Sequence, residues 1–440
     1  MQVRYIYSAC VSIQTPDCTI LCDPWFGEAY EGAWAQWPKI DNPLEVCGPA
    51  DFVFISHVHP DHYDPQFLKR YLAKYPTAKV LIAEHTPDLL GRKLRSRGIT
   101  PIVGLTNVKD TWLTPIPNEA NHGVNIDSAL VVKYGDLTVA NLNDNPYDQN
   151  QVDVIKFYTG DHPTVALLPF VGAGPWPQCC EFDSPTERQE AEHLKKQMHL
   201  KGFQRYCEAL KPTVAVPFAG QYWLHGPQLD LNHSRGMADA TECVPLWKHV
   251  WVPADGGQST LTVKNAEEWE ISSYREEPYD WPTVRRALHE ADWYAQYPYT
   301  PYEGRYSNDI PGLFYRYERE IQVPIERLPL LKLLQSAAKR SEKRFRPQPT
   351  LYVCLKPTGF DKWFVLSTAS GKVTEEDDVD GFAPRYEITM DARYLFGCLV
   401  RLYNWNSARI GSLMRYRAVP GAFDSARYDL LGDYLDALRV

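Results

Sequence analysis

Short runs of apolar residues, each closed by turn-forming residues, divide the first half of the chain. Runs of this length are typical of β-strands. They occupy residues 3–13, 20–22, 52–55, 80–83, 129–134, 137–142, 165–168 and 214–216. Between them, apolar residues recur at helical spacing in 66–75, 87–96 and 185–210. Strands with interspersed helices predict packed layers of the α/β or α+β class.

The start of the longest predicted helix is marked by its own residues. Ser184, Pro185 and Glu187 form the pattern Ser-x-x-Glu with proline at the first helical position. In this pattern the serine and glutamate side chains cap the exposed backbone groups of the first turn, and proline tolerates that turn. We therefore predict a helix that begins at residue 185 and ends at 210.

The pattern changes after about residue 265. Tyrosine, tryptophan and proline crowd between 274 and 317, and clean periodic runs are few until a helix predicted at 325–343 and strands at 350–354 and 363–366. At 440 residues the chain also exceeds the size at which one hydrophobic core usually keeps growing. We predict a larger catalytic domain over 1–265 and a smaller α+β accessory or substrate region over 266–440.

The segment FISHVHPDHYDP concentrates histidine and aspartate directly after a buried apolar strand. The proline inside it stops a strand or helix from continuing, so these side chains lie on a loop at a strand end. Imidazoles and carboxylates are the usual ligands of zinc and iron. A loop can turn alternate side chains toward two centres, so His57 and His59 can bind one ion while Asp61 and His62 bind a second.

Two adjacent ions need more ligands than this loop offers, and three candidates stand at later strand ends. They are His122 before the strand at 129, Asp144 after the strand that ends at 142, and His225 after the strand at 214–216. Asp144 is suited to bridge two cations, because each carboxylate oxygen can bind one. Asp61 and Asp144 are therefore the candidate catalytic carboxylates of the site.

Other residues near strand ends have supporting roles in this interpretation. Asp23, in the segment CDPWF, closes a strand and can orient a ligand histidine through a hydrogen bond. His85 and His162 also follow strands, but neither is needed to complete two ligand sets. We interpret both as structural or supporting residues.

Composition narrows the possible partners. A formal net charge of −9 argues against extensive nucleic-acid binding. The opening residues lack the pattern of a secretory signal, and no uninterrupted apolar stretch predicts a membrane span, so we expect a cytoplasmic protein. The ten cysteines are irregularly spaced without a Cys-x-x-Cys pair, which predicts reduced thiols.

The segments SHVHPDHYD and CDPWF, together with His122 and Asp144, resemble the metallo-β-lactamase superfamily. This resemblance implies an αββα sandwich with a dinuclear metal site at one edge of the two sheets. More narrowly, the chain is similar to the CMP-N-acetylneuraminic acid hydroxylases. That likeness runs through VNIDSALVVKYGDLTVANLND, LLPFVGAGPWP and the closing WNSARIGSLMRYRAVPGAFDSARYDLLGDYL.

One departure from those hydroxylases limits what the resemblance implies. They join a Rieske iron–sulfur domain to the metallo-β-lactamase-like domain, and a Rieske centre needs Cys-x-His and Cys-x-x-His pairs. Neither pair occurs in this sequence. If the chain activates oxygen, we expect the electrons to come from a separate reductase or ferredoxin, or from the substrate itself.

Two functions stay open for this site. The first is a diiron oxygenase that hydroxylates a small polar metabolite, with Asp144 bridging the ions. Its ligands would be His57, His59 and His122 for one iron, and Asp61, His62 and His225 for the other. The alternative is a hydrolase of esters, lactones, amides or phosphodiesters that uses zinc, manganese or iron and a metal-bound hydroxide. A metal-binding scaffold without chemistry is a third, less favoured possibility.

Overall fold

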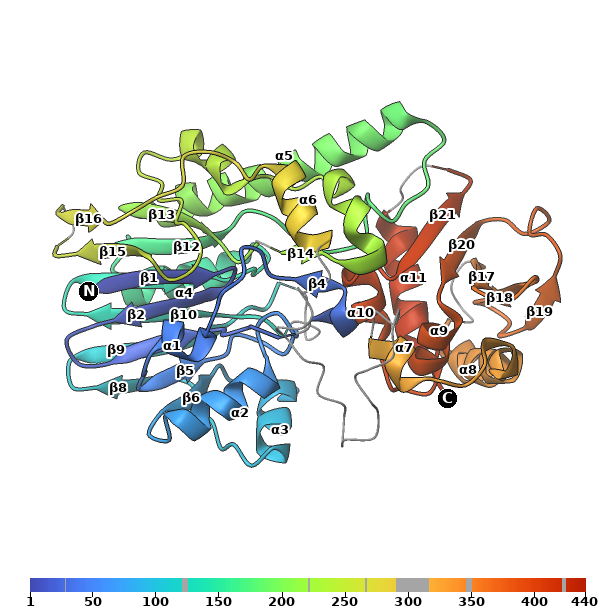
Figure 1. The fold of residues 1–440 in the computed structure, drawn as a ribbon, viewed down its shortest axis with the longest axis horizontal. Helices are drawn as coiled ribbons and strands as arrows, with labels where there is room; N and C mark the ends of the chain where they lie inside the picture. Colours follow the sequence, from blue (N-terminus) through green and yellow to red (C-terminus); the bar gives the residue numbers. More distant parts are fainter. Residues whose placement is uncertain are drawn as a thin grey trace.

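The computed structural model describes residues 1–27, 29–120, 126–220, 222–265, 267–289, 316–345, 350–421 and 425–440. Its larger part is built on two β-sheets (Figure 1). The first has the strand order β16 (Trp269–Ile271), β15 (Ser259–Val263), β1 (Gln2–Tyr7), β2 (Cys10–Gln14), β3 (Thr19–Cys22), β5 (Phe52–Phe54), β6 (Lys79–Ile82) and β7 (Ile102–Val103). The second has the order β13 (Val214–Phe218), β12 (Val165–Pro169), β11 (Leu137–Asn141), β10 (Ser128–Tyr134), β9 (Thr111–Pro117) and β8 (Thr106–Val108).

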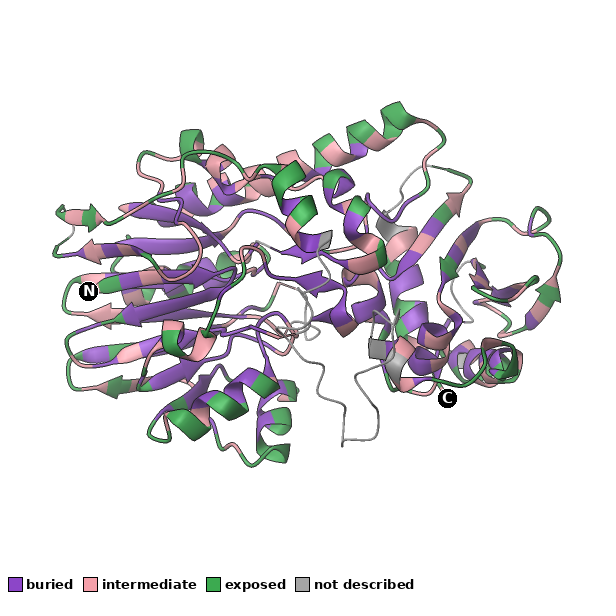
Figure 2. Cartoon of the chain, viewed as in Figure 1, coloured by how far each residue is buried: buried purple, intermediate pink, exposed green. Residues whose placement is uncertain are grey.

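The two sheets pack face to face around a shared core. Buried side chains from both sheets fill the space between them, and they include Val11, Ile13, Leu113, Leu130, Val132, Val165 and Val216. Figure 2 shows the strands of both sheets as largely buried. Burial of this apolar surface, at about 25 cal/mol per Å², is the main force that holds the sheets together.

Helices cover the outer face of each sheet. Helices α2 (Pro65–Lys74) and α3 (Leu89–Ser96) pack on the first sheet through Phe67, Leu68, Tyr71, Leu90 and Leu94. Helices α4 (Gln149–Thr159) and α5 (Pro185–Leu210) pack on the second through Val152, Ile155, Phe203, Tyr206 and Leu210. The layers are therefore helix, sheet, sheet and helix, and the expected αββα sandwich is confirmed.

Each predicted strand has an observed counterpart, although β7, β8, β9, β15 and β16 were not predicted and the N-terminal run is divided differently. The apolar run 3–13 is two strands, because β1 and β2 form an antiparallel hairpin. Ser8, at the turn, has a positive φ of 49° and is buried, as is Ala9 beside it. The turn lies inside the core, so no exposed polar residues interrupt the apolar pattern there.

The predicted helix at 185–210 is confirmed at both ends. The Ser184 side chain accepts a hydrogen bond from the backbone N–H of Glu187 at 3.2 Å. The return bond differs from the predicted capping box, because the Glu187 carboxylate accepts from the N–H of Asp183 at 3.2 Å. Glu187 thus provides a hydrogen-bond acceptor for the backbone N–H of Asp183, the residue before the cap.

The C-terminal region has its own sheet, to the right in Figure 1. Its order is β19 (Val373–Glu376), β18 (Trp363–Ser367), β17 (Tyr352–Pro357), β20 (Arg385–Met390) and β21 (Met414–Val419). Its helices are α7 (Arg316–Glu320), α8 (Leu330–Phe345), α9 (Ala392–Leu399), α10 (Trp405–Ile410) and α11 (Ser425–Ala437). The predicted helix at 325–343 and the strands at 350–354 and 363–366 correspond to α8, β17 and β18.

The remaining short elements lie between the strands and helices named above. They are η1 (Tyr30–Gly32), β4 (Trp34–Ala35), α1 (Pro43–Cys47), β14 (Trp223–Leu224), η2 (Gly226–Ser234), η3 (Ala240–Leu246), α6 (Trp281–His289) and η6 (Ile325–Arg327). One hydrophobic cluster runs from the helices on the first sheet through η1 into the C-terminal sheet. Strand β16 still pairs with the first sheet, beyond the predicted boundary at 265. In the described parts of the chain, no helix has the length and apolar character needed to cross a membrane.

Candidate metal centre

The ends of four strands meet at one edge of the sandwich. Asp23 directly follows β3, and the histidine loop follows β5, which runs parallel to β3. In the second sheet, Asp127 directly precedes β10 and Asp144 follows β11, which runs antiparallel to β10. The hydroxyl of Ser128 donates to the backbone carbonyl of Ser56 at 2.6 Å and ties the two sheets together at this edge.

Two groups of side chains in the described residues have the spacing needed to hold a metal ion. One is His57, His59 and Asp127, and the other is His57, His62 and Asp144. Within each group the ligand atoms lie within 4.8 Å of one another. Each group offers two imidazoles and one carboxylate, and both contain His57.

The first group is centred on the Nε2 atom of His57, which is completely buried. This nitrogen lies 2.9 Å from Nδ1 of His59 and 3.7 Å from Oδ1 of Asp127. The other ring nitrogen of His57, Nδ1, lies 3.0 Å from the hydroxyl oxygen of Ser56. The His57 ring is therefore held by Ser56 at Nδ1, and its Nε2 faces the other two ligand candidates of the group.

The second group is centred on Nε2 of His62. This nitrogen lies 3.5 Å from Oδ2 of Asp61 and 3.5 Å from Oδ2 of Asp144. The other oxygen of Asp144, Oδ1, lies 3.9 Å from Nδ1 of His57. The two oxygens of Asp144 thus face different histidines.

Asp23 holds the His62 ring in place. Its Oδ2 lies 2.9 Å from Nδ1 of His62. The same carboxylate accepts hydrogen bonds from the Ser56 N–H at 2.7 Å and from the Ser56 hydroxyl at 2.6 Å. An ionised Asp23 carboxylate can only accept, so it holds the proton on Nδ1 of His62, and with an ion bound Nε2 would be the ligand atom. The predicted hydrogen bond between Asp23 and a histidine of the loop is confirmed.

Charge in the centre is unevenly distributed. Burial lowers the pKa of His57 well below its usual value, and the neighbouring His62 adds to this effect. Burial also acts to lower the pKa of His62, but Asp144 and Asp61 outweigh it and hold this pKa well above the usual value. Burial, followed by the charge of Asp144, raises the pKa of Asp127 to about 8. Buried carboxylates this close need a positive partner or a proton.

These residues fit a bound cation on two observations. Oδ1 of Asp144 is buried and accepts no hydrogen bond from the described residues, so a ligand position is left over. The donors are imidazole nitrogens and carboxylate oxygens, which suit zinc, iron and manganese. The geometry is therefore that of a metal centre of nitrogen and oxygen ligands.

Two contacts reach the centre from outside the sandwich. The hydroxyl of Tyr30, in η1, donates to Oδ1 of Asp61 at 2.7 Å. The amide nitrogen of Asn406, in α10, lies 3.1 Å from Nε2 of His59. Sequence reasoning predicted neither residue, because nothing near Tyr30 or Asn406 in the chain carries a metal-binding pattern.

The structure brings five of the predicted ligands together, namely His57, His59, Asp61, His62 and Asp144. His122 lies outside the described residues. His225 lies at the start of η2, where its Nε2 is 2.9 Å from the carbonyl oxygen of Leu288 and burial lowers its pKa to about 4. It belongs to neither of the metal-compatible groups of the described chain. The ligand roles of His122 and His225 stay predictions.

Asp127 is the ligand candidate that the sequence interpretation missed. It stands one residue before β10, in the same segment as His122. The position of Asp127 in the sequence could have indicated its role. A residue at the start of β10 lies at the same edge of the sheet as a residue at the end of the antiparallel strand β11.

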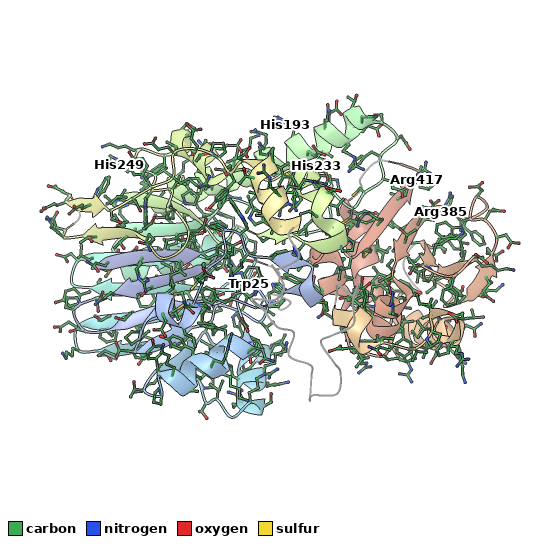
Figure 3. All side chains as sticks on the ribbon, in the orientation of Figure 1. Trp25, His193, His233, His249, Arg385 and Arg417 are labelled. Atoms are coloured by element: carbon green, nitrogen blue, oxygen red, sulfur yellow. The ribbon has the colours of Figure 1, made fainter. Side chains whose placement is uncertain are left out.

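The remaining histidines lie apart from this edge or outside its ligand groups. Figure 3 shows His193, His233 and His249 along the upper side of the molecule, away from Trp25, which lies two residues after Asp23. His162 is exposed. Nε2 of His85 is buried and unbonded among the described residues, but His85 is in neither metal-compatible group.

Comparison with known proteins identifies the class. Residues 2–219 match the family model described as "Beta-lactamase superfamily domain". This part of the chain belongs to the metallo-β-lactamase superfamily. The match covers both sheets up to β13 and includes every residue of the two metal-compatible groups.

Individual relatives narrow the comparison. The chain is 32% identical over 255 residues to a candidate Rieske 2Fe-2S iron-sulfur protein of Mycolicibacterium smegmatis, covering 54% of this chain and 47% of that protein. It is 26% identical over 240 residues to cytidine monophosphate-N-acetylneuraminic acid hydroxylase of Xenopus laevis, covering 50% of this chain and 38% of that protein. These alignments span less than half the length of either relative.

Solved structures are similar to the chain at a lower level. CmlA, a diiron beta-hydroxylase from Streptomyces venezuelae, matches with a TM-score of 0.37 and 18% identity, over 56% of this chain and 48% of that one. A similarity of this size carries no inference about activity.

Proposed function

We propose that the chain is a dinuclear non-haem iron oxygenase that hydroxylates a small polar metabolite with electrons from a separate donor. The observation that carries the proposal is the pair of ligand groups at the sandwich edge. Each contains two histidines and one aspartate, but both contain His57, so only one of the two proposed sets can keep this composition. Two histidines and one carboxylate are typical of non-haem Fe(II) oxygenases, where the remaining coordination positions stay open.

The ligands divide into two sets in this proposal. His57, His59 and Asp127 hold one ion, while His62, Asp61 and Asp144 hold the other. Asp144 would contribute Oδ2, which lies 3.5 Å from Nε2 of His62, while its Oδ1 lies 3.9 Å from Nδ1 of His57. His122, which lies outside the described residues, is the proposed further ligand of the first set.

The chain's own residues prepare these ligands. Asp23 keeps the Nδ1 proton of His62 and so presents Nε2 as the ligand atom. The Tyr30 hydroxyl occupies Oδ1 of Asp61 and leaves Oδ2 for the ion. The low pKa of His57 keeps this imidazole neutral, as a metal ligand must be. When bound, a reduced iron pair would supply the electrons and the open positions for dioxygen.

The relatives support oxidation and an electron carrier. One is named as a hydroxylase of a nucleotide-linked sugar acid, a small polar molecule, and another as a candidate Rieske iron–sulfur protein. The 440 residues of this chain contain no Rieske cysteine–histidine pairs. An electron donor outside these 440 residues, such as a reductase or ferredoxin, is therefore part of the proposal.

A metal-dependent hydrolase is the second candidate, and the family itself favours it. The matched domain carries the name of the beta-lactamase superfamily, and the same nitrogen and oxygen ligands suit zinc. Paired cations lower the pKa of water between them and polarise a carbonyl or phosphoryl oxygen. No side-chain nucleophile would then be needed.

Metal analysis with a reductant test separates the two functions. The proposal predicts about two irons per chain in aerobically purified protein, a visible absorption that bleaches on reduction, and dioxygen uptake only with a reductant. Two zincs with turnover of esters, lactones or phosphodiesters in the absence of reductant would favour the hydrolase. Bound metal with neither reaction would contradict both and leave a metal-binding scaffold.

A further inference from the structure

The C-terminal region contacts the metal centre through Asn406. Nδ2 of Asn406 lies 3.1 Å from Nε2 of His59, although the two residues are 347 positions apart. Asn406 is the second residue of α10 and is half-buried. This contact joins the first ligand group to a part of the chain outside the matched family domain.

The two nitrogens of His59 face different neighbours. Nδ1 lies 2.9 Å from Nε2 of His57 and points into the group that His57 and Asp127 complete. Nε2 points toward Asn406 on the opposite side of the ring. If His59 binds an ion, Nδ1 is the ligand atom and Nε2 carries the proton.

A ligand imidazole normally donates its second N–H to an acceptor that fixes the ring and its tautomer. An asparagine amide offers both an acceptor oxygen and a donor nitrogen, and its orientation follows the hydrogen bonds around it. With an ion at Nδ1 of His59, the Asn406 amide would turn its oxygen toward Nε2–H. Asn406 would then accept the N–H of His59 and fix the orientation of its ring, as Asp23 does for His62.

Contacts at both ends of helix α10 fix the position of Asn406. The Asn404 side chain caps it by accepting from the Ser407 N–H at 2.6 Å, and the indole N–H of Trp34 donates to its last carbonyl, on Ile410, at 3.2 Å. The helix also lies tightly against η1. A Cβ added at Gly411 would lie 3.1 Å from Cβ of Tyr30.

We infer that Asn406 is a positioning residue of the metal centre, which holds His59 with Nδ1 free to bind the ion. According to this inference, the C-terminal region helps to position the ligands of the metal centre. It supports His59 through Asn406, and it packs on η1, from which Tyr30 reaches Asp61. This inference rests on the proposed metal-dependent function.

Co²⁺ titration tests it through binding rather than activity. The metal-free full-length chain is titrated anaerobically with Co²⁺ against a competing chelator, and visible absorption reports each ion bound. Asn406→Ala should weaken one of the two ions by about 10- to 100-fold, the usual cost of losing such a support. Asn406→Asp should restore binding, because its carboxylate can only accept from Nε2–H. Circular dichroism and thermal melting check that each variant is folded.

Arg409→Ala is the matched control on the same helix. Its guanidinium pairs with Asp436 at 3.2 Å and is absent from the ligand groups, so its loss should leave Co²⁺ affinity unchanged. Wild-type affinity in Asn406→Ala would overturn the inference while the proposed function stands. Equal weakening in Asn406→Asp and Asn406→Ala would overturn the acceptor role. A wild-type chain that binds no ion would refute the proposed function and this inference with it.

Discussion

The two regions around the metal centre support its histidines in different ways. On the sandwich side, the carboxylate of Asp23 is completely buried and holds His62 at 2.9 Å. It follows β3, the strand that pairs with β5. On the C-terminal side, the half-buried neutral amide of Asn406 holds His59 at 3.1 Å.

This difference indicates which of the two regions contributes more to the positions of the ligand side chains. A charge-assisted hydrogen bond is roughly twice as strong as a neutral one, and burial strengthens it further. The sandwich edge therefore fixes the positions of the ligands. On the proposed assignment, the C-terminal region supports His59 through Asn406 and packs against η1, from which Tyr30 donates to Asp61. Substitutions on the sandwich side should consequently have the larger effects.

Removal of His57 should have the largest effect, because both metal-compatible groups contain it. We predict that His57→Ala loses at least one of the two ions, weakens the other and abolishes turnover. Metal content by mass spectrometry checks this. His193→Ala is the control, since His193 is exposed on α5 and should leave both ions in place. Equal metal content in the two variants would refute the ligand assignment.

Asp23→Asn should follow, with about a 100-fold loss of affinity for the ion at His62. The amide keeps the size of the side chain but removes the charge that fixes the Nδ1 proton. Competition titration with Co²⁺ measures the loss. If Asp23→Asn costs less than Asn406→Ala, the proposed difference between the two regions is reversed.

Tyr30→Phe should reduce Co²⁺ affinity less than Asp23→Asn does. It removes one hydrogen bond to the Asp61 carboxylate without changing the packed ring. A hydrogen bond to a charged group contributes about 1.5 kcal/mol, or roughly tenfold in affinity. The expected loss is confined to the ion held by Asp61 and His62. Loss of the other ion instead would show that η1 does not act through Asp61.

Arg409→Ala should have the smallest effect and should change stability alone. The Arg409–Asp436 pair lies partly exposed between α10 and α11, so its loss should cost about 0.2–1 kcal/mol of unfolding free energy. Urea denaturation measures this. A simultaneous drop in metal affinity would mean that the whole C-terminal packing, rather than Asn406, supports the centre.

The sandwich could be predicted because its strands alternate with turns and its helices have clear apolar faces. Helix α4 was missed, and its buried residues explain why. Gln151 and Thr159 lie buried beside Val152 and Ile155, so polar residues interrupt the apolar spacing. Oε1 of Gln151 accepts hydrogen bonds from the side-chain amides of Asn118 and Asn145, which lie outside the helix.

The C-terminal region could be predicted only in part. Helix α9 has only eight residues, little more than two turns, so its apolar spacing is too short to mark a helix by itself. Helix α10 has only six residues. Elements of these two kinds are fixed by tertiary packing, which local sequence patterns do not encode.

The ligands that share one loop were predictable, whereas those defined by the fold were not. His57, His59, Asp61 and His62 stand within six positions, and Asp144 follows a clear strand. Asp127 needed the antiparallel pairing of β10 with β11. Tyr30 and Asn406 needed the packing of the C-terminal region, and the place of His225 needed the path of the chain after β14.

The central claim is that two ions lie side by side at the sandwich edge in separate ligand sets. Anomalous scattering from crystals of the metal-loaded chain tests it most directly. We predict two peaks, one bounded by His57, His59 and Asp127 and the other by Asp61, His62 and Asp144. A single peak, or peaks away from these side chains, would contradict it.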